Sequence, residues 1–361
     1  MTTAVRPGRV GIVGCGNVTD LYLPGSARFP IIELAACADM DPARAADLAA
    51  RGGFPALAVD ALIADPSIEI VLVLTPPTAH AAVSRAAIAA GKHVYSEKPL
   101  ATSREDASAI LGDAAAAGVR LGAAPDTFLG GGLQTARALI DEGAIGTPLS
   151  ASAAVAHLGP ERWHPNPGIF YAQGGGPLLD VGPYYVAALV SLLGPIRRVA
   201  AAGRGLGTER LVATGQRAGT TVIAETPTTV VASLGFASGV VGGLTASFDV
   251  VASLAPHLEI HGTAGSLSLG DPNTFDGAVR YRPLDSEGWE DVPLRFDASV
   301  ARGVGLADLI LAVRTGSPLR ASGEFAFHVL DVLLALETAT TTDRWETVAS
   351  TTERPAPLAP T

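Results

Sequence analysis

Lysine, cysteine and long apolar runs are the scarce features of this sequence of 361 residues. Its only lysines are Lys92 and Lys98, so arginine supplies nearly all of the positive charge. The only cysteines, Cys15 and Cys37, do not have the spacing of metal ligands, so we expect a metal-free protein in a reducing, cytoplasmic location. No uninterrupted apolar run reaches about 18 residues, which argues against a transmembrane helix. Residues 1–9 lack the apolar core of a secretory signal, so none is expected.

Positive charge as a whole is also in the minority. The chain has 25 Lys and Arg residues against 35 Asp and Glu residues, which gives a formal net charge of -10 at pH 7. This surplus of negative charge disfavours nucleic acids and anionic membrane surfaces as partners. The length suits about two domains, each with a sizeable core.

Near the N-terminus, residues 9–14 are typical of a buried parallel strand and run straight into a glycine-rich loop. That loop, Gly14 to Thr19, reads G-x-G-x-x-T and precedes a helix-like segment. The first glycine of such a motif permits a tight turn, and the second lets a pyrophosphate approach the backbone at a helix N-terminus. Thr19 departs from the Gly or Ala that usually ends the motif. The pattern predicts a dinucleotide site with these cofactor contacts: Gly14, Gly16, Asn17 and Val18.

A second strand is expected over residues 31–38 and ends at Asp39. Asp39 follows the glycines by about 20 residues, which is where an acidic residue binds the adenosine ribose of a dinucleotide. A carboxylate there repels a 2′-phosphate, and Met40 stands where an arginine would favour NADP, so NAD is the expected cofactor. The alternative is that Asp39 only opens a turn before the next helix.

Strand and helix patterns go on alternating to residue 123. They are expected in the order 70–74, 78–90, 93–96, 102–117 and 120–123. This alternation predicts a doubly wound parallel sheet over residues 1–123, with binding residues at the carboxyl ends of its strands. A proline pair after the strand 70–74 stops the ladder and shapes a crevice wall. The residues expected to bind the cofactor from these strand ends are Thr75, Pro76, His80, Glu97 and Lys98.

Lys98 is also a candidate catalytic residue. It ends a short apolar strand, in a chain that uses arginine for almost every other positive charge. A lysine provides a compact ammonium with a movable pKa, which arginine cannot provide. The alternative is a surface lysine that ends a strand.

Beyond residue 124 the pattern changes to strands that alternate in polarity, as in an antiparallel sheet with one covered face. They are expected at 149–157, 199–203, 230–236, 240–248, 257–262, 266–269 and 279–282. Residues 124–361 are therefore predicted to form an α+β domain with a large, open, mostly antiparallel sheet, closed by helices near 305–314 and 324–340. Few helices remain for the second face of this sheet, and an uncovered apolar face usually marks an interface, so we expect a homodimer or homotetramer.

Asp180 and Tyr184 follow a run of three glycines and are four residues apart, which places them on one face of a helix that starts near Asp180. A phenol beside a carboxylate at the mouth of a helix can act as an acid/base pair. The alternative is that Asp180 caps the helix and Tyr184 packs in the core. Tyr185 points about 100° away and is expected to matter only for packing.

Together, Gly14-Cys15-Gly16-Asn17, Thr75-Pro76-Pro77-Thr78-Ala79-His80, Glu97-Lys98-Pro99 and the segment 174–184 resemble the glucose-fructose oxidoreductase/inositol dehydrogenase/MocA (Gfo/Idh/MocA) family. The resemblance covers nearly the whole chain. It implies a Rossmann domain joined to an α/β domain whose open mixed sheet packs against a second copy. The family's catalytic lysine corresponds to Lys98 and its aspartate to Asp180.

Two positions depart from the usual pattern of that family. Its histidine corresponds to Tyr184, as in the glucose-fructose oxidoreductase and dimeric dihydrodiol dehydrogenase branches, where tyrosine transfers the proton. Pro77 stands where the family often has asparagine. A free tyrosine titrates near 10, so the resemblance implies that Lys98 favours the phenolate and that Asp180 orients one of the two.

The expected activity is hydride transfer between NAD and a hydroxyl or keto group of a sugar, cyclitol or glycoside. Asp126, Trp163 and His164 are candidates for substrate contacts, with loop packing as the alternative. Two other functions remain open: an NADPH-dependent reductase of a keto-sugar or diketone, and a non-catalytic regulator that binds a dinucleotide on the same scaffold. Retention of Lys98, Asp180 and Tyr184 together favours an enzyme.

Overall fold

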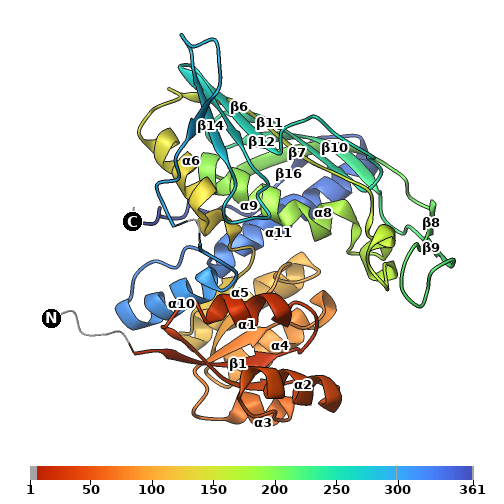
Figure 1. The fold of residues 1–361 in the computed structure, drawn as a ribbon, viewed down its shortest axis with the longest axis vertical. Helices are drawn as coiled ribbons and strands as arrows, with labels where there is room; N and C mark the ends of the chain where they lie inside the picture. Colours follow the sequence, from red (N-terminus) through yellow and green to blue (C-terminus); the bar gives the residue numbers. More distant parts are fainter. Residues whose placement is uncertain (1–5, 298, 360–361) are drawn as a thin grey trace. The chain divides into compact units, whose positions relative to one another are not determined.

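The computed structural model describes residues 6–297 and 299–359, which form two compact units (Figure 1). The first unit contains the chain up to Leu129 and the segment Ser299–Leu330, and the second contains the rest. The sequence-based boundary between residues 123 and 124 assigned the segment 299–330 to the second domain. The segment returns because its apolar residues, such as Leu309 and Ile310, are fully buried in the first unit. An apolar helix does not reveal from its own sequence which sheet it will cover.

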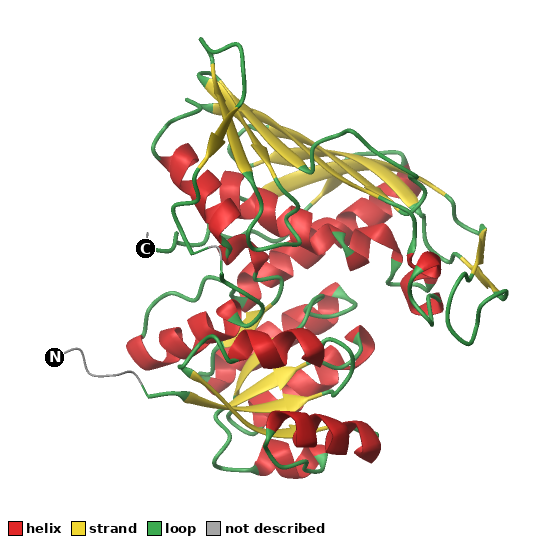
Figure 2. Cartoon of the chain, in the orientation of Figure 1, coloured by secondary structure: helices red, strands yellow, loops and turns green. Residues whose placement is uncertain are grey.

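The first unit contains a five-stranded sheet in the order β2-β1-β3-β4-β5, and every neighbouring pair is parallel. The strands are β1 (Gly8–Val13), β2 (Ile32–Ala38), β3 (Ile70–Val73), β4 (His93–Ser96) and β5 (Leu121–Ala123). All four residues of β3 are buried, as expected for a sheet covered on both faces. Figure 2 shows helices on both faces of this sheet. The doubly wound parallel sheet predicted from the sequence is confirmed.

Local capping signals set the helices of the first unit. They are α1 (Thr19–Ser26), α2 (Pro42–Gly52), α3 (Val59–Ala64), α4 (Pro77–Ala89), α5 (Arg104–Ala117) and α10 (Val304–Thr315). The Asp41 carboxylate accepts a hydrogen bond from the Ala43 N–H at the start of α2, and Ser103 accepts one from the Asp106 N–H at the start of α5. Gly118 ends α5 with a φ of 66°, which favours glycine.

The second unit contains a nine-stranded sheet in the order β15-β14-β13-β12-β6-β11-β10-β7-β16. Its strands are β6 (Pro148–Ala156), β7 (Ile196–Arg204), β10 (Thr229–Phe236), β11 (Val241–Ser247), β12 (Leu258–Gly262), β13 (Gly265–Leu269), β14 (Val279–Pro283), β15 (Glu290–Val292) and β16 (Glu346–Thr347). The pair β6–β11 is parallel and the other pairs are antiparallel, which confirms a large and mostly antiparallel sheet.

Helices cover one face of this sheet (Figure 1). They include α6 (Gly131–Asp141), α8 (Gly176–Asp180), α9 (Gly182–Leu193) and the second half of α11 (Gly323–Thr342). Every residue of α9 is buried. Within β6, Ala151, Ala153 and Val155 are buried, whereas the alternate residues such as Ser152 are more exposed. The opposite face of the sheet carries no helix of this chain in Figures 1 and 2.

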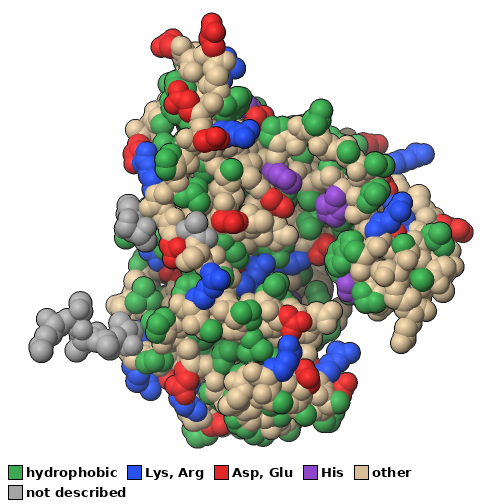
Figure 3. Space-filling view, viewed as in Figure 1, with side chains coloured by type: hydrophobic (Ala, Val, Ile, Leu, Met, Phe, Trp, Pro, Cys, Tyr) green, Lys and Arg blue, Asp and Glu red, His purple; other side chains and the backbone are tan. Residues whose placement is uncertain are grey.

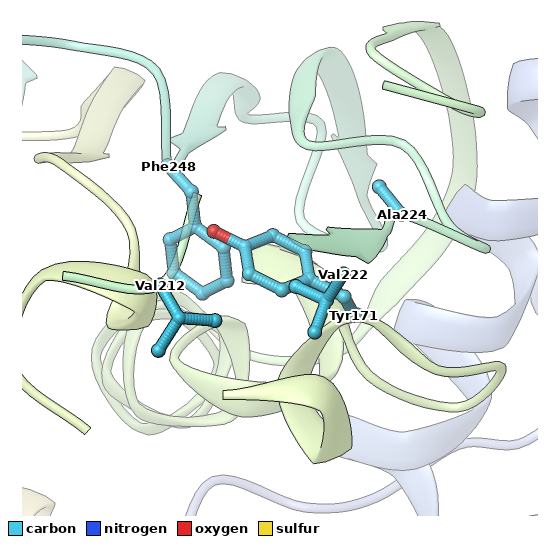
Figure 4. Packing of buried hydrophobic residues seen from close by; sticks show 5 residues of the cluster. All are labelled: Tyr171, Val212, Val222, Ala224 and Phe248. Atoms are coloured by element: carbon cyan, nitrogen blue, oxygen red, sulfur yellow. The ribbon is translucent and has the colours of Figure 1, made fainter. Parts of the chain in front are cut away.

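A separate two-stranded hairpin, β8 (Glu209–Leu211) and β9 (Thr221–Ile223), is held near the short helix α7 (Gly168–Tyr171) by a small hydrophobic cluster (Figure 4). The rings of Tyr171 and Phe248 meet edge to face there, with centroids 6.0 Å apart. The Tyr171 hydroxyl donates to Glu161, and Arg210 of the hairpin pairs with Asp249. The strands β8, β9, β15 and β16 escaped prediction because each has only two or three residues.

One helix of the part that the structure describes, α11, is long and apolar enough to cross a membrane by length and composition. Of its most apolar stretch, 61% is buried inside the protein. Core helices share these properties, so α11 by itself does not indicate a membrane. Figure 3 shows acidic and basic side chains scattered over the visible face, without a gathered basic patch.

Candidate active site

The glycine-rich loop after β1 has the shape of an anion cradle. Gly14 has a φ of 100°, and a Cβ there would lie 2.6 Å from backbone atoms of Leu74 and Thr75, so only glycine fits. A Cβ on Gly16 would meet nothing within 4 Å. Among the described residues, none accepts a hydrogen bond from the N–H groups of residues 16–18. Open space facing backbone donors before α1 fits the pyrophosphate of a dinucleotide.

Asp39 stands beside this loop, directly after β2. Its Oδ2 accepts a hydrogen bond from the Cys15 N–H at 2.7 Å, and its Oδ1 accepts one from the Asp41 N–H at 2.8 Å. The second of these bonds shapes the turn that was the alternative role of Asp39, but Asp41 is the residue that caps α2. The side chain of Met40 is 96% exposed. The Asp39 carboxylate is therefore fixed next to the phosphate cradle, as ribose recognition requires.

The two cysteines lie together under the same loop. Both are buried, and neither forms a disulfide. Burial, together with the neighbouring Cys37, raises the pKa of the Cys15 thiol from 9.0 to about 12. Across residues 6–297 and 299–359, no three His, Cys, Asp or Glu side chains are arranged to hold a metal.

Lys98 follows β4 and its backbone is firmly held. The Glu97 carboxylate accepts the Lys98 N–H at Oε2, at 2.9 Å, and the Tyr22 hydroxyl at Oε1, also at 2.9 Å. Tyr22 belongs to α1 and is fully buried, and Glu97 is 7% exposed. Burial, followed by the charge of Glu97, raises the pKa of Tyr22, so the phenol remains a donor. Lys98 itself is partly buried, and its peptide bond to Pro99 is cis.

His80, in the first turn of α4, was expected to contact the cofactor. The structure places both of its ring nitrogens against backbone carbonyl oxygens. Nδ1 lies 2.7 Å from the Pro99 oxygen and Nε2 lies 2.8 Å from the Thr75 oxygen. The residue is 1% exposed. Its ring therefore connects the chain after β3 with the chain after β4.

Asp126, expected at the substrate, is a fully buried carboxylate in the first unit. Its Oδ2 accepts hydrogen bonds from the N–H groups of Gly303 and Gly305, at 3.3 and 3.1 Å, and its Oδ1 lies 3.2 Å from the Arg302 guanidinium. Burial raises the pKa of Asp126, and Arg302 opposes that shift. Both oxygens hold the returning segment at the start of α10, which sequence spacing could not indicate.

In the second unit, Asp180 and Tyr184 lie on two consecutive helices and not on one. Asp180 is the last residue of α8, and α9 begins at Gly182. The break occurs at Val181, whose carbonyl accepts the Tyr184 N–H at 3.2 Å. No side chain caps α9, so Asp180 does not have the capping role that was its alternative. Asp180 is partly buried and Tyr184 is 7% exposed.

Tyr185 was expected to serve packing only, yet its hydroxyl joins a polar cluster. It lies 2.8 Å from Nδ1 of His257 and 3.1 Å from Oδ1 of Asp271. Burial, followed by Asp271, raises the pKa of Tyr185, so the phenol stays protonated and can donate to the carboxylate. This cluster ties the first turn of α9 to the loops before β12 and after β13.

Trp163 and His164 lie on the loop before α7, in the second unit. The Trp163 ring is 60% exposed. Its centroid is 5.5 Å from that of His164 and 6.0 Å from that of Phe170, and the latter two are 4.9 Å apart. The N–H of Asn166 donates to Nδ1 of His164 at 3.1 Å. The loop thus presents a small exposed aromatic surface, a type of surface on which a sugar ring can stack.

Two protein-family models match the chain. The model described as "Oxidoreductase family, NAD-binding Rossmann fold" matches residues 8–124. The model described as "GFO/IDH/MocA C-terminal domain" matches residues 133–268. The two matches fall on the parallel sheet of the first unit and on the nine-stranded sheet of the second.

Named relatives span most or part of the chain. The 1,5-anhydro-D-fructose reductase of Ensifer adhaerens is 30% identical over 92% of this chain and 96% of its own length. The dTDP-3,4-didehydro-2,6-dideoxy-alpha-D-glucose 3-reductase of Saccharopolyspora spinosa is 35% identical over 53% of this chain, which spans 58% of that protein. A solved structure of levoglucosan dehydrogenase with NADH and levoglucosan is 22% identical, covers 96% of this chain and 100% of its own, and has a TM-score of 0.82, which shows a shared fold.

Proposed function

Because this chain belongs to the Gfo/Idh/MocA family of NAD-binding oxidoreductases, we propose that it transfers hydride between NAD and a hydroxyl or keto group of a sugar, cyclitol or glycoside. The observation that carries the proposal is the edge of the first unit where the strands β1 to β4 end. There an open glycine loop, a fixed acidic residue and the lysine segment meet on one sheet. The relatives' names, which refer to sugar-like substrates, support the substrate class.

In the cofactor site, each residue of the first unit has a separate proposed role. The N–H groups of Gly16, Asn17 and Val18 bind the pyrophosphate, and Asp39 binds the ribose hydroxyls. The turn at Gly14, together with Thr75 and Pro76, forms the wall of the crevice. Bound NAD supplies the acceptor or donor of hydride. Glu97 holds the backbone of Lys98, whose ammonium stabilises the negative oxygen that forms during proton transfer.

Removal of hydride from an alcohol also requires removal of the hydroxyl proton. We assign that proton transfer to Tyr184 and the orientation of the reacting groups to Asp180. In the reductive direction the same phenol donates the proton to the new alkoxide. Trp163 provides an aromatic platform for the sugar, and His164 a polar contact beside it. Asp126 takes no direct part in this scheme, because its carboxylate is buried and holds α10.

Reduction of a keto-sugar is the second candidate, since both relatives described above are named reductases. A non-catalytic regulator finds no support in those names. The experiment is a binding titration with NADH and NADPH, followed by turnover of a panel of sugars, polyols and keto-sugars in both directions. We expect tighter binding of NADH and turnover of at least one sugar-like compound. Binding without any turnover across the panel would favour the regulator.

We further propose a cytoplasmic homodimer or homotetramer that pairs through the bare face of the nine-stranded sheet. The two free cysteines support the reducing compartment. On the bare face, Val231 and Val241 are 55% and 59% exposed, and Ser152 and Ser233 are also exposed. A flat face of small, uncharged side chains on a chain with a net charge of -10 suits a second copy of itself.

Light scattering tests this assembly at micromolar concentration. We expect a dimer or tetramer for the wild type and smaller species for Val231→Asp, because a buried, unpaired carboxylate is costly. Val251→Asp is the matched control, since Val251 is 83% exposed on the loop after β11. A monomeric wild-type protein, or equal behaviour of the two variants, would contradict the proposed interface.

A further inference from the structure

The imidazole of His80 joins two loops at the cofactor edge of the first unit. The Thr75 carbonyl belongs to the loop after β3, and the Pro99 carbonyl to the loop after β4. Their oxygens lie 2.8 and 2.7 Å from the two ring nitrogens. Both partners are acceptors, so the ring donates from each nitrogen that carries a proton. At 1% exposure, solvent is not a substitute for these bonds.

The segment that carries Lys98 is thus held on both sides. Before the lysine, the Glu97 carboxylate accepts the Lys98 N–H and is itself held by Tyr22. After the lysine, the carbonyl of Pro99 faces His80. A change at His80 therefore reaches Lys98 through one residue of backbone.

We propose that His80 is a positioning residue that fixes Lys98 through the Pro99 carbonyl, and that it does not bind the cofactor directly. The inference rests on the proposed function for the importance of Lys98. Its structural part, that His80 sets the position of this lysine, stands without it.

His93 provides a matched control in the same sheet. It lies at the opposite end of β4, where its Nδ1 accepts the Arg120 N–H at 2.9 Å. Burial lowers the pKa of His93, which agrees with a neutral ring that accepts. Both histidines therefore connect neighbouring strands at an end of β4, but only His80 does so beside Lys98.

The first test measures turnover. We expect His80→Ala to lower kcat by about 100-fold, the cost of a misplacement of roughly 1 Å, while the Kd for NADH changes by less than about threefold. His80→Gln, whose amide can still donate to one carbonyl, should recover part of the loss. In a Lys98→Ala background, His80→Ala should lower kcat by less than about threefold, because its effect passes through the lysine. Independent, multiplying losses would overturn the inference, as would an equal loss of kcat in His93→Gln.

The second test needs no substrate. Lys98 and Lys92 are the only lysines, so acetylation by an N-hydroxysuccinimide ester, followed by mass spectrometry, reports each of them. We expect His80→Ala and His80→Gln to change the acetylation rate of Lys98 several-fold, with Lys92 and the melting temperature unchanged. His93→Gln should leave Lys98 at the wild-type rate. An unchanged rate at Lys98 in both His80 variants would overturn the inference. A changed rate in a protein that turns over nothing would leave it intact and remove the proposed function instead.

Discussion

The two ends of strand β4 carry the same residue types in different settings. At the amino end, Lys92 is 8% exposed, and its ammonium donates to the carbonyl oxygens of Asp65 and Ile68 at 2.7 and 2.8 Å. At the carboxyl end, Lys98 is partly buried, and the adjacent Glu97 holds its backbone N–H. Lys92 thus closes a loop with its side-chain head, whereas Lys98 is fixed by its main chain.

The two histidines repeat this contrast. His93 accepts a single hydrogen bond at the amino end of β4, and His80 faces two carbonyl oxygens near its carboxyl end. The residue type therefore does not decide the role, because the partners at each edge differ. In an open parallel sheet ligands bind at the carboxyl edge, and there the backbone is secured by side chains around the candidate site.

The largest expected difference is between the two lysines. Lys98→Ala should lower turnover by about 10²–10⁴-fold with little change in stability. Lys98→Arg should not rescue it, since a guanidinium cannot take the position of an ammonium. Lys92→Ala should keep turnover and lower the free energy of unfolding by about 1–3 kcal/mol, because two carbonyls lose their donor. Steady-state kinetics and urea unfolding of the three variants measure this contrast, and equal turnover in Lys98→Ala and Lys92→Ala would break it.

A comparable contrast is expected between the neighbouring tyrosines of α9. Tyr184→Phe should lower turnover by about 10²–10⁴-fold and spare NADH binding, since only the proton-transferring hydroxyl is lost. Combined with Lys98→Ala, the two losses should be strongly non-additive if both residues serve one step.

Tyr185→Phe should act mainly on stability, by about 1–3 kcal/mol, because it removes the partner of His257 and Asp271. Kinetics and thermal unfolding of both phenylalanine variants decide the matter. An active Tyr184→Phe beside an inactive Tyr185→Phe would move the proton transfer to Tyr185. Two active variants would point to His164.

A smaller effect is expected at Asp39, on cofactor choice. Asp39→Ala should narrow the preference for NAD over NADP by about tenfold or more, the loss of one charged hydrogen bond to the ribose. The variant also frees the Cys15 N–H, so Asp39→Asn, which keeps an acceptor there, separates loop geometry from charge. The measurement is kcat/KM with each cofactor. A wild-type protein that prefers NADP would refute the assignment.

The smallest effect is a dependence of stability on alkaline pH. The pKa of Cys15 is raised from 9.0 to about 12 in the folded protein, so its unfolded thiol ionises first as the pH rises. The contribution of this buried thiol is complete below pH 9.0 and is lost toward about 12. Urea unfolding should therefore show a decline of at most about 1.4 kcal/mol per pH unit above this point. Cys15→Ala should flatten the decline, and an unchanged slope would show that the thiol is not responsible.

Much of the first unit could be predicted because its signals are local. The Gly14 turn, the end of β2 at Asp39 and the Lys98 segment each lie within a few residues of the strand that places them. The alternating polarity of β6 likewise announced the covered sheet of the second unit. In both cases the periodicity of neighbouring side chains carries the information.

The missed features depend on residues that are far apart in sequence. Tyr185 meets His257 and Asp271 across separations of 72 and 86 residues, and Asp126 meets Gly305 across 179. No periodicity reports such pairs, so a buried carboxylate looked like a substrate contact and a phenol looked like packing. The break at Val181 was missed for a different reason, since Gly182 and Pro183 are compatible with either one helix or two.

The segment that returns to the first unit has a consequence for biosynthesis. A Cβ on Gly8 of β1 would lie 2.9 Å from Ile310, and one on Gly25 would lie 2.0 Å from the carbonyl oxygen of Arg302, so both glycines are shaped by residues made nearly three hundred positions later. During translation the parallel sheet emerges long before α10 does. The nucleotide-binding half of the protein is thus completed only when almost the entire chain has left the ribosome, and until then its apolar β1 flank needs protection from a chaperone or from the ribosome itself.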